Sequence, residues 1–134
     1  MANRILLVDD EADFLQVFGD WLRFKGYDVT EARDGRSALD AMRSGDFDLV
    51  ILDLMMPKLD GYDFCKALRG DRSLQGTPIL VLTAVPKHNG LYNHKSMGIS
   101  DYKEKLVSHA EISLAIDRLI AEKEGSSRKG GSLQ

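Results

Sequence analysis

The sequence has little of what a disulfide-stapled, membrane-spanning or nucleic-acid-binding protein needs. Its 134 residues contain one cysteine, so no internal disulfide can form, and a reducing, intracellular compartment is expected. The longest apolar run near the start, at residues 5–8, is too short for a signal peptide or a membrane span. A formal charge of −3 without a basic block argues against direct binding to nucleic acid. We therefore expect a soluble, cytoplasmic protein.

Hydrophobic residues make up 43% of the chain, and four short aliphatic runs predict β-strands at 5–8, 27–32, 49–52 and 79–82. The first, third and fourth runs are continuously apolar, as expected for strands covered on both faces of a parallel sheet. The run at 27–32 alternates in polarity and therefore predicts an edge strand. A fifth strand around 99–103 is required by the architecture more than it is indicated by its residues.

Helical periodicity separates these runs. Apolar residues at three- and four-residue steps predict a first helix over 14–22 that ends at Gly26, and a last helix over 112–120 that closes at Glu124–Gly125. Two further helices are predicted to follow Asp34–Gly35 and Asp60–Gly61 and to end near Gly45 and Gly70.

Strands that alternate with helices of this length form βαβ units with right-handed crossovers. The sequence therefore predicts an α/β fold, a doubly wound five-stranded parallel sheet in the flavodoxin-like order 2-1-3-4-5 with helices on both faces. Residues 86–98 are poorly suited to the helix due there, and we expect a short or mobile element. The domain is expected to span 1–124, followed by a disordered tail or linker remnant at 125–134.

Acidic residues follow the first and third predicted strands. In the predicted order these strands are neighbours, about 4.8 Å apart, so Asp9, Asp10 and Asp53 are expected to share one small volume. Two carboxylates about 4 Å apart repel by roughly 1 kcal/mol in water and roughly 4 kcal/mol at a dielectric of 20. Such a group needs a cation or raised pKa values, and the oxygen ligands favour Mg²⁺.

The same strand order brings Thr83, at the end of the fourth strand, next to Asp53. A hydroxyl donor and a nearby ammonium group, combined with Mg²⁺, are the groups that stabilise a transferring phosphoryl group. A carboxylate beside the metal can serve as the nucleophile and form an aspartyl phosphate.

Motifs at four strand ends resemble those of response-regulator receiver domains of two-component signalling, over residues 3 to about 123. Each motif is weak alone, but four in register are specific. They are Val8-Asp9-Asp10-Glu11, Asp53-Leu54-Met55-Met56-Pro57 with Asp60-Gly61, Leu82-Thr83-Ala84, and the segment from Gly98 to Lys105.

The resemblance implies a regulatory phosphoacceptor domain rather than an enzyme, one that assists its own phosphorylation and dephosphorylation. A histidine kinase or phosphotransfer protein would supply the phosphoryl group, and a downstream protein or effector domain would respond. The implied roles are the phosphoacceptor at Asp53, Mg²⁺ ligands at Asp9, Asp10 and Asp53, phosphoryl contacts at Thr83 and Lys105, and a switch formed by Thr83 and Tyr102.

One departure from the family pattern concerns the lysine. The family usually has proline after it, in a cis peptide that aims the side chain, whereas Leu106 follows Lys105 here. A cis bond without proline costs about 3 to 4 kcal/mol. Either the loop stores that strain or, as we expect, the bond is trans and Lys105 is placed differently. Lys103, two residues earlier on the same side of an ideal strand, is a competing candidate.

Simpler interpretations stay open. Asp9 and Asp10 could serve merely as a helix cap, without a metal. Thr83 could be a plain hydroxyl at a strand end, and Lys105 a surface lysine. Tyr102 could be a half-buried strand aromatic. The whole domain could be a degenerate receiver that binds partners without phosphorylation.

Two enzyme or carrier classes share this topology. A phosphatase with an aspartyl nucleophile usually has a second acid two residues on, where Met55 stands here, which argues against this class. A flavin carrier needs a phosphate-binding loop after its first strand, where this sequence has the acids Asp9-Asp10-Glu11 instead. Among the remaining residues, Trp21 is predicted to belong to the core, and His109 to the surface without a ligand role.

Overall fold

The computed structural model describes residues 3–53, 61–83, 98–105 and 108–132. The predicted 86–98 element therefore lies almost wholly outside the described residues. The elements are β1 (Arg4–Val8), α1 (Ala12–Phe24), β2 (Asp28–Ala32), α2 (Gly35–Ser44), β3 (Leu49–Leu52), α3 (Gly61–Arg69), β4 (Ile79–Thr83), β5 (Asp101–Glu104) and α5 (His109–Ser132).

The five strands form one parallel sheet in the order β2-β1-β3-β4-β5, which confirms the predicted topology. β2 lies at an edge, as its alternating pattern predicts. β5 forms the other edge, and Tyr102 is its buried residue, while the other three residues of the strand are half-buried. β5 begins two residues later than predicted, because the strand is defined by its pairing with Leu80–Thr83 rather than by an apolar run of its own.

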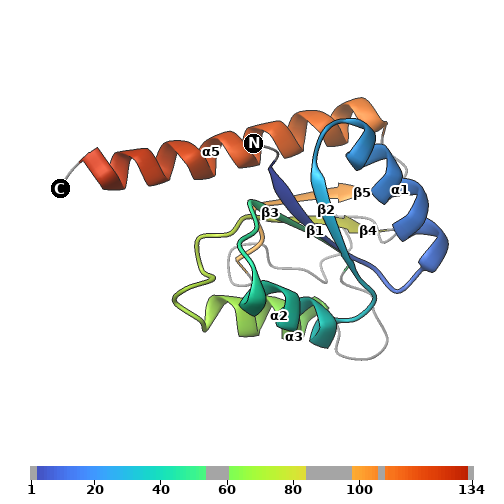
Figure 1. The fold of residues 1–134 in the computed structure, drawn as a ribbon, viewed down its shortest axis with the longest axis horizontal. Helices are drawn as coiled ribbons and strands as arrows, with labels where there is room; N and C mark the ends of the chain where they lie inside the picture. The colour runs from blue at the N-terminus through green and yellow to red at the C-terminus, as the bar shows by residue number, and fades with distance from the viewer. Residues whose placement is uncertain (1–2, 54–60, 84–97, 106–107, 133–134) are drawn as a thin grey trace.

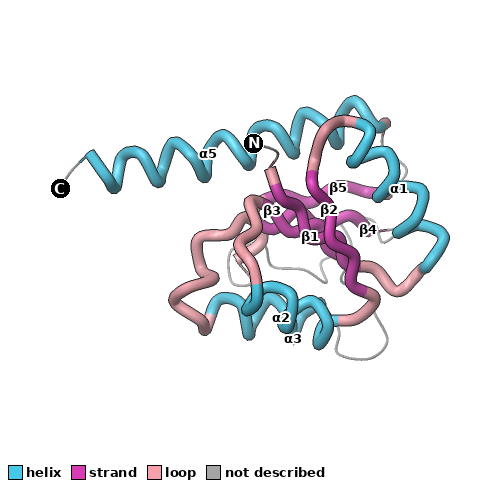
Figure 2. The backbone as a smooth tube through the Cα atoms, in the orientation of Figure 1, coloured by secondary structure: helices cyan, strands magenta, loops and turns pink. Residues whose placement is uncertain are grey.

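Helices cover both faces of the sheet (Figure 1), with α2 and α3 on one face and α1 and α5 on the other. The tube view shows the strands enclosed between these two pairs (Figure 2). Successive strand residues point to opposite faces, so Leu6 and Val8 join the core under α2 and α3, while Ile5 and Leu7 join the core under α1 and α5.

Local signals set three of the helix boundaries. α1 is followed by Gly26 at φ +99°, a left-handed conformation that glycine adopts without strain. α2 begins after Asp34, whose carboxylate accepts a hydrogen bond from the backbone N–H of Ser37 at 2.8 Å. Gly45 follows the last residue of α2. These boundaries agree with the sequence predictions.

The predicted end of the last helix at Glu124–Gly125 is wrong. α5 continues to Ser132, and its C-terminal part extends beyond the sheet (Figure 1). The physical reason is that glycine weakens a helix by about 1 kcal/mol but still supplies the backbone N–H, so it does not end a helix by itself. Residues 125–132 are thus helical, and the domain boundary at residue 124 stays a prediction.

Candidate functional site

The parallel ladder extends one residue beyond the ends of β1 and β3. The N–H of Asp9 donates to the carbonyl of Ala32 and the N–H of Asp53 donates to the carbonyl of Val8, both at 3.1 Å. These bonds fix the backbone of both acids at the carboxyl edge of the sheet, where β1 and β3 are neighbours. The strand order reverses at this point, which is where open α/β sheets place their ligands.

Asp9, Asp10 and Asp53 each place one carboxylate oxygen so that all three oxygens lie within 4.8 Å of one another. Asp9 is 1% exposed, Asp53 is 6% exposed, and Asp10 is half-buried. The prediction that these three acids meet is confirmed. Their arrangement is an acidic cluster that could bind a metal ion.

The two carboxylate oxygens of Asp9 have different surroundings. Oδ1 accepts a hydrogen bond from the N–H of Glu11 at 3.0 Å. Oδ2 is buried without a hydrogen bond of regular geometry, and its close neighbour is Nζ of Lys105 at 2.8 Å. Burial raises the pKa of Asp9, although Lys105 and the Glu11 N–H act in the opposite direction. The ammonium of Lys105 is the cation that compensates the buried charge at Oδ2.

Lys105 brings its ammonium group into the acidic cluster. Nζ lies 2.8 Å from Oδ2 of Asp9, 2.8 Å from Oε1 of Glu11 and 3.3 Å from Oδ2 of Asp53, and the side chain is only 11% exposed. Burial alone lowers the pKa of Lys105, but the hydrogen bonds to Asp9 and Glu11 outweigh it and raise the pKa above its usual value. Lys105 is therefore charged at neutral pH.

Lys105 lies in the site, because its ammonium reaches both Asp9 and Asp53, and its different placement relative to the family's lysine stays a prediction. Lys103 instead lines a surface hollow with Asp101 and Arg118. The strand periodicity that made Lys103 a competitor ends at Glu104, so it does not carry over to Lys105. The bond between Lys105 and Leu106 lies outside the described residues.

Thr83 and Tyr102 occupy the predicted strands. Thr83 is the last residue of β4, which pairs with β3, and it lies opposite Glu104 of β5. Tyr102 pairs with Val81 and is 2% exposed, in the core layer under α2 and α3. The structure therefore supports the burial of Tyr102 in the state described here, and its switching role stays a prediction.

Two neighbours of Lys105 were not predicted from the sequence. Glu11 binds its ammonium, as given above, and the ring of Phe14 lies below it, with Nζ 4.4 Å from the ring centroid. A signal was present for Phe14, since it lies in the first turn of the helix that directly follows the acidic motif. The same residue also fits the apolar stripe of the helix, which concealed this second contact.

The sequence profile of the response regulator receiver domain matches residues 5–117. The chain belongs to this family. A probable transcriptional regulator, ycf27 of Porphyridium aerugineum, is 39% identical over 85% of the chain and 46% of its own length. The receiver domain thus spans about half the length of the curated relatives that it matches.

Solved receiver-domain structures superpose closely on this one. Chemotaxis protein CheY4 of Vibrio cholerae is 30% identical with a TM-score of 0.82, covering 89% of this chain and 99% of that chain. The receiver domain of sensor histidine kinase PA1611 from Pseudomonas aeruginosa gives 30% identity and a TM-score of 0.82, with coverage of 90% and 99%. The latter structure carries a magnesium ion in its active site cleft.

Crossing a bilayer requires a helix that is both long and apolar. None of the helices within the described ranges combines these two properties.

Proposed function

We propose that this receiver domain is a phosphorylation switch, in which Asp53 accepts a phosphoryl group from a phosphohistidine of a histidine kinase or phosphotransfer protein. The observation that carries the proposal is the meeting of three carboxylates with a buried ammonium at the carboxyl edge of the sheet. A module that only binds partners would gain nothing from concentrating these charges, because burying them costs free energy. The interpretation as a phosphorylation-independent module is therefore not favoured.

Asp9, Asp10 and Asp53 would hold Mg²⁺ in this proposal. The donor set consists of carboxylate oxygens, which hard divalent ions prefer, and the buried Oδ2 of Asp9 lacks a regular hydrogen bond. The magnesium ion named for the Pseudomonas aeruginosa receiver domain supports the same choice. When bound, Mg²⁺ would neutralise negative charge on the phosphoryl oxygens.

The chemistry requires Asp53 to act as the nucleophile. One of its carboxylate oxygens would attack the phosphorus atom, a P–O bond would form, and the P–N bond to the donor imidazole would break with its electron pair leaving on nitrogen. Lys105 already lies 3.3 Å from Oδ2 of Asp53, so its ammonium can pair with the phosphoryl oxygens. The hydroxyl of Thr83 is the further proposed contact.

The added charge would act on a domain with two pre-existing states. Phosphoryl attraction for Thr83, coupled to the position of Tyr102, would shift the population towards the state that a downstream protein or effector domain binds. The greater length of the relatives is consistent with an effector domain as one such partner. Because ATP-dependent kinases supply phosphohistidine, we place this reaction in the cytoplasm.

The direct test is phosphoryl transfer from a small donor. With Mg²⁺ and acetyl phosphate, the intact mass of the wild-type chain should rise by about 80 Da, the mass of one phosphoryl group. Asp53→Asn should not be labelled, because the amide is not a nucleophile here, and omission of Mg²⁺ should suppress labelling of the wild type.

Asp13→Asn is the matched control for this experiment. Asp13 is an exposed acid in the first turn of α1, so the substitution removes the same charge close to the site without touching the cluster. It should be labelled like the wild type. Labelling of Asp53→Asn to the wild-type level would show that Asp53 is not the acceptor. If the wild type is not labelled, the domain would instead be a receiver that binds partners without phosphorylation.

A further inference from the structure

Lys105 directly follows β5, and its long side chain has to be held in one direction for its ammonium to stay beside Asp53. Salt bridges hold the charged end, and Glu11 is the exposed partner among them, with 65% of its side chain accessible to solvent. A contact with a neighbouring element would restrict the lysine side chain further.

Three aromatic residues of α1, which we call the aromatic row, lie between Lys105 and the start of α5. Phe14 and Phe18 stack with ring centroids 5.1 Å apart and planes 10° apart, and Phe18 contacts Trp21 at 5.2 Å. Their spacing of four and three residues keeps them on one face of the helix. The row begins at the ammonium of Lys105, which lies 4.4 Å from the centroid of Phe14.

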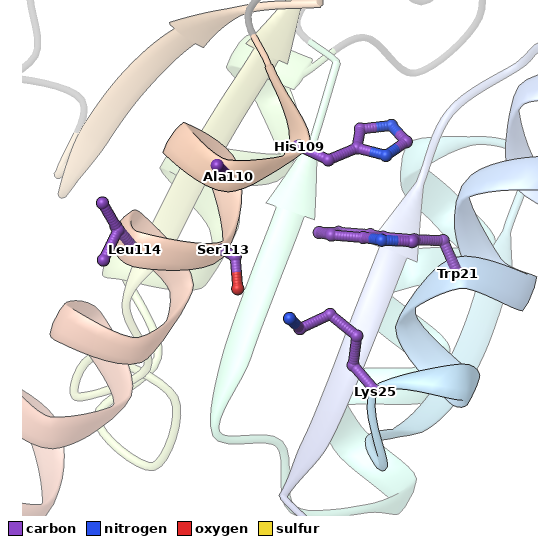
Figure 3. A pocket seen from close by; sticks show the side chains of 6 residues that line it. All are labelled: Trp21, Lys25, His109, Ala110, Ser113 and Leu114. Atoms are coloured by element: carbon purple, nitrogen blue, oxygen red, sulfur yellow. The ribbon is translucent and has the colours of Figure 1, made fainter.

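The far end of the row holds the beginning of α5. The imidazole of His109 packs 4.5 Å from the ring of Trp21 and meets the edge of Phe18 at 6.0 Å. Figure 3 shows the Trp21 ring between the His109 ring and the end of the Lys25 side chain, whose Nζ is 5.5 Å from the ring. His109 is thus exposed, as predicted, but packed against an aromatic neighbour, and Trp21 is half-buried.

Lys105 and His109 therefore both rest on the aromatic row, one on each side of residues 106–107. We propose that Phe14 is a positioning residue for Lys105, whose ring face holds the ammonium beside Asp53. The proposal rests on the proposed function, because it concerns the lysine that would contact the phosphoryl group. Phe14 would act only through Lys105, and it would contact neither the Mg²⁺ ion nor the phosphoryl group of the proposed function.

The physical basis is the negative face of the aromatic ring. A cation near that face is attracted by the ring quadrupole, and the attraction strengthens when water is excluded. Lys105 is 11% exposed, so its ammonium is largely desolvated at the contact. Leucine at position 14 would keep most of the apolar packing but would lose this attraction, whereas tyrosine would keep both.

The experiment compares Phe14→Leu with Phe14→Tyr, and uses Phe24→Leu as the matched control. Phe24 lies on the same helix and is 88% exposed, so Phe24→Leu makes the same chemical change away from the site. The first measurement is the proton NMR shift of the Lys105 ε-methylene group without metal, assigned by its loss in Lys105→Arg. A ring under the ammonium should move this signal upfield in the wild type, Phe14→Tyr and Phe24→Leu, and Phe14→Leu should abolish the displacement.

The second measurement is the affinity for beryllofluoride in the presence of Mg²⁺, followed by the fluorescence of Trp21. Phe14→Leu should bind about 3- to 10-fold more weakly than the wild type, the range expected for one cation–π contact. Phe14→Tyr and Phe24→Leu should stay within about twofold of the wild type. If Phe14→Leu loses its cooperative melting transition, Phe14→Met replaces it as the apolar variant of similar size.

The outcomes separate the inference from the proposed function. Wild-type affinity in Phe14→Leu, with or without loss of the lysine displacement, would show that Phe14 only packs and would overturn the inference. If the wild-type domain shows the upfield lysine signal but no response to beryllofluoride, the proposed function fails while the contact between Phe14 and Lys105 stands. Loss of both signals in Phe14→Leu and their recovery in Phe14→Tyr support the inference.

Discussion

At the scale of single residues, Lys105 balances the charge of the acidic cluster. Asp9 is 1% exposed and Asp53 is 6% exposed, so water does little to stabilise either carboxylate. The ammonium lies within 3.3 Å of both. Removal of one partner of a buried ion pair leaves the other charge without compensation, and this is more costly than loss of the attraction alone.

Lys105→Met should therefore destabilise the metal-free domain at pH 7. We expect a loss of about 1 to 3 kcal/mol in the free energy of unfolding, the usual penalty for an unsatisfied buried charge, measured by urea denaturation. Mg²⁺ should restore most of this loss, because it supplies the missing positive charge. Lys103→Met removes a lysine of β5 that lines the hollow beside Arg118, and it should show neither the loss nor the recovery. Equal destabilisation by the two variants would contradict a special role for Lys105 in the cluster.

The residue scale also shows where sequence reasoning reached its limit. Asp9, Asp10 and Asp53 could be predicted together because strand order alone brings the ends of β1 and β3 together. The direction of Lys105 could not, because it depends on side-chain contacts beyond the end of a strand, where no periodicity applies. The expectation built on the missing proline did not include Glu11 and Phe14, whose contacts with the ammonium could not be read from the sequence.

At the scale of elements, α5 packs on one face of the sheet and is also hydrogen-bonded to the residue before the edge strand β2. Tyr27 precedes β2, and its hydroxyl donates to Oδ1 of Asp117 on α5 at 2.7 Å. Burial and this hydrogen bond raise the pKa of Tyr27 to about 12 from the ordinary value of 10.0. The folded domain thus favours the protonated phenol, so the contribution of Tyr27 to stability is present below about pH 10 and is lost as the pH rises through about 12.

The pH dependence of this hydrogen bond is testable by absorbance at 295 nm. The wild-type domain should show a tyrosine titration step near pH 12 that is missing in Tyr27→Phe. Asp117→Asn keeps a hydrogen-bond acceptor but removes the negative charge, so it should move this step towards pH 10. A Tyr27 step at the ordinary value in the wild type would mean that the hydrogen bond between Tyr27 and Asp117 does not form in solution.

The sequence predicted an element well only where that element is determined by its own residues and not by its partners in the fold. Continuous apolar runs predicted β1, β3 and β4, because buried strands need apolar residues on both faces. β5 was indicated weakly, since Asp101, Lys103 and Glu104 are polar and the strand exists through its pairing with β4. The end of α5 was missed because glycine lowers helix propensity without removing a backbone donor.

At the scale of the whole molecule, the two core layers meet at the edge that carries the acids. β1 and β3 contribute residues to both layers, and Asp9 and Asp53 continue these strands by one residue. The geometry of the acidic cluster is therefore a property of the folded sheet and does not exist in the unfolded chain. A ligand that needs this geometry must bind the folded state and stabilise it.

Mg²⁺ should accordingly raise the stability of the whole domain in a concentration-dependent way. Binding to the folded state alone adds RT ln(1 + [L]/Kd), about 2.7 kcal/mol when the free ion is at 100 times its dissociation constant. For a chain of this length this corresponds to a rise of roughly 5 to 15 °C in Tm, measured by calorimetry in Mg²⁺ and in EDTA. Asp10→Asn should lose most of the rise, because it removes one of the three carboxylates, whereas Asp13→Asn, with the same charge change outside the cluster, should keep it. If both variants respond to Mg²⁺ like the wild type, the stabilisation comes from general screening of acidic charge, and the cluster is not the site at which the ion binds.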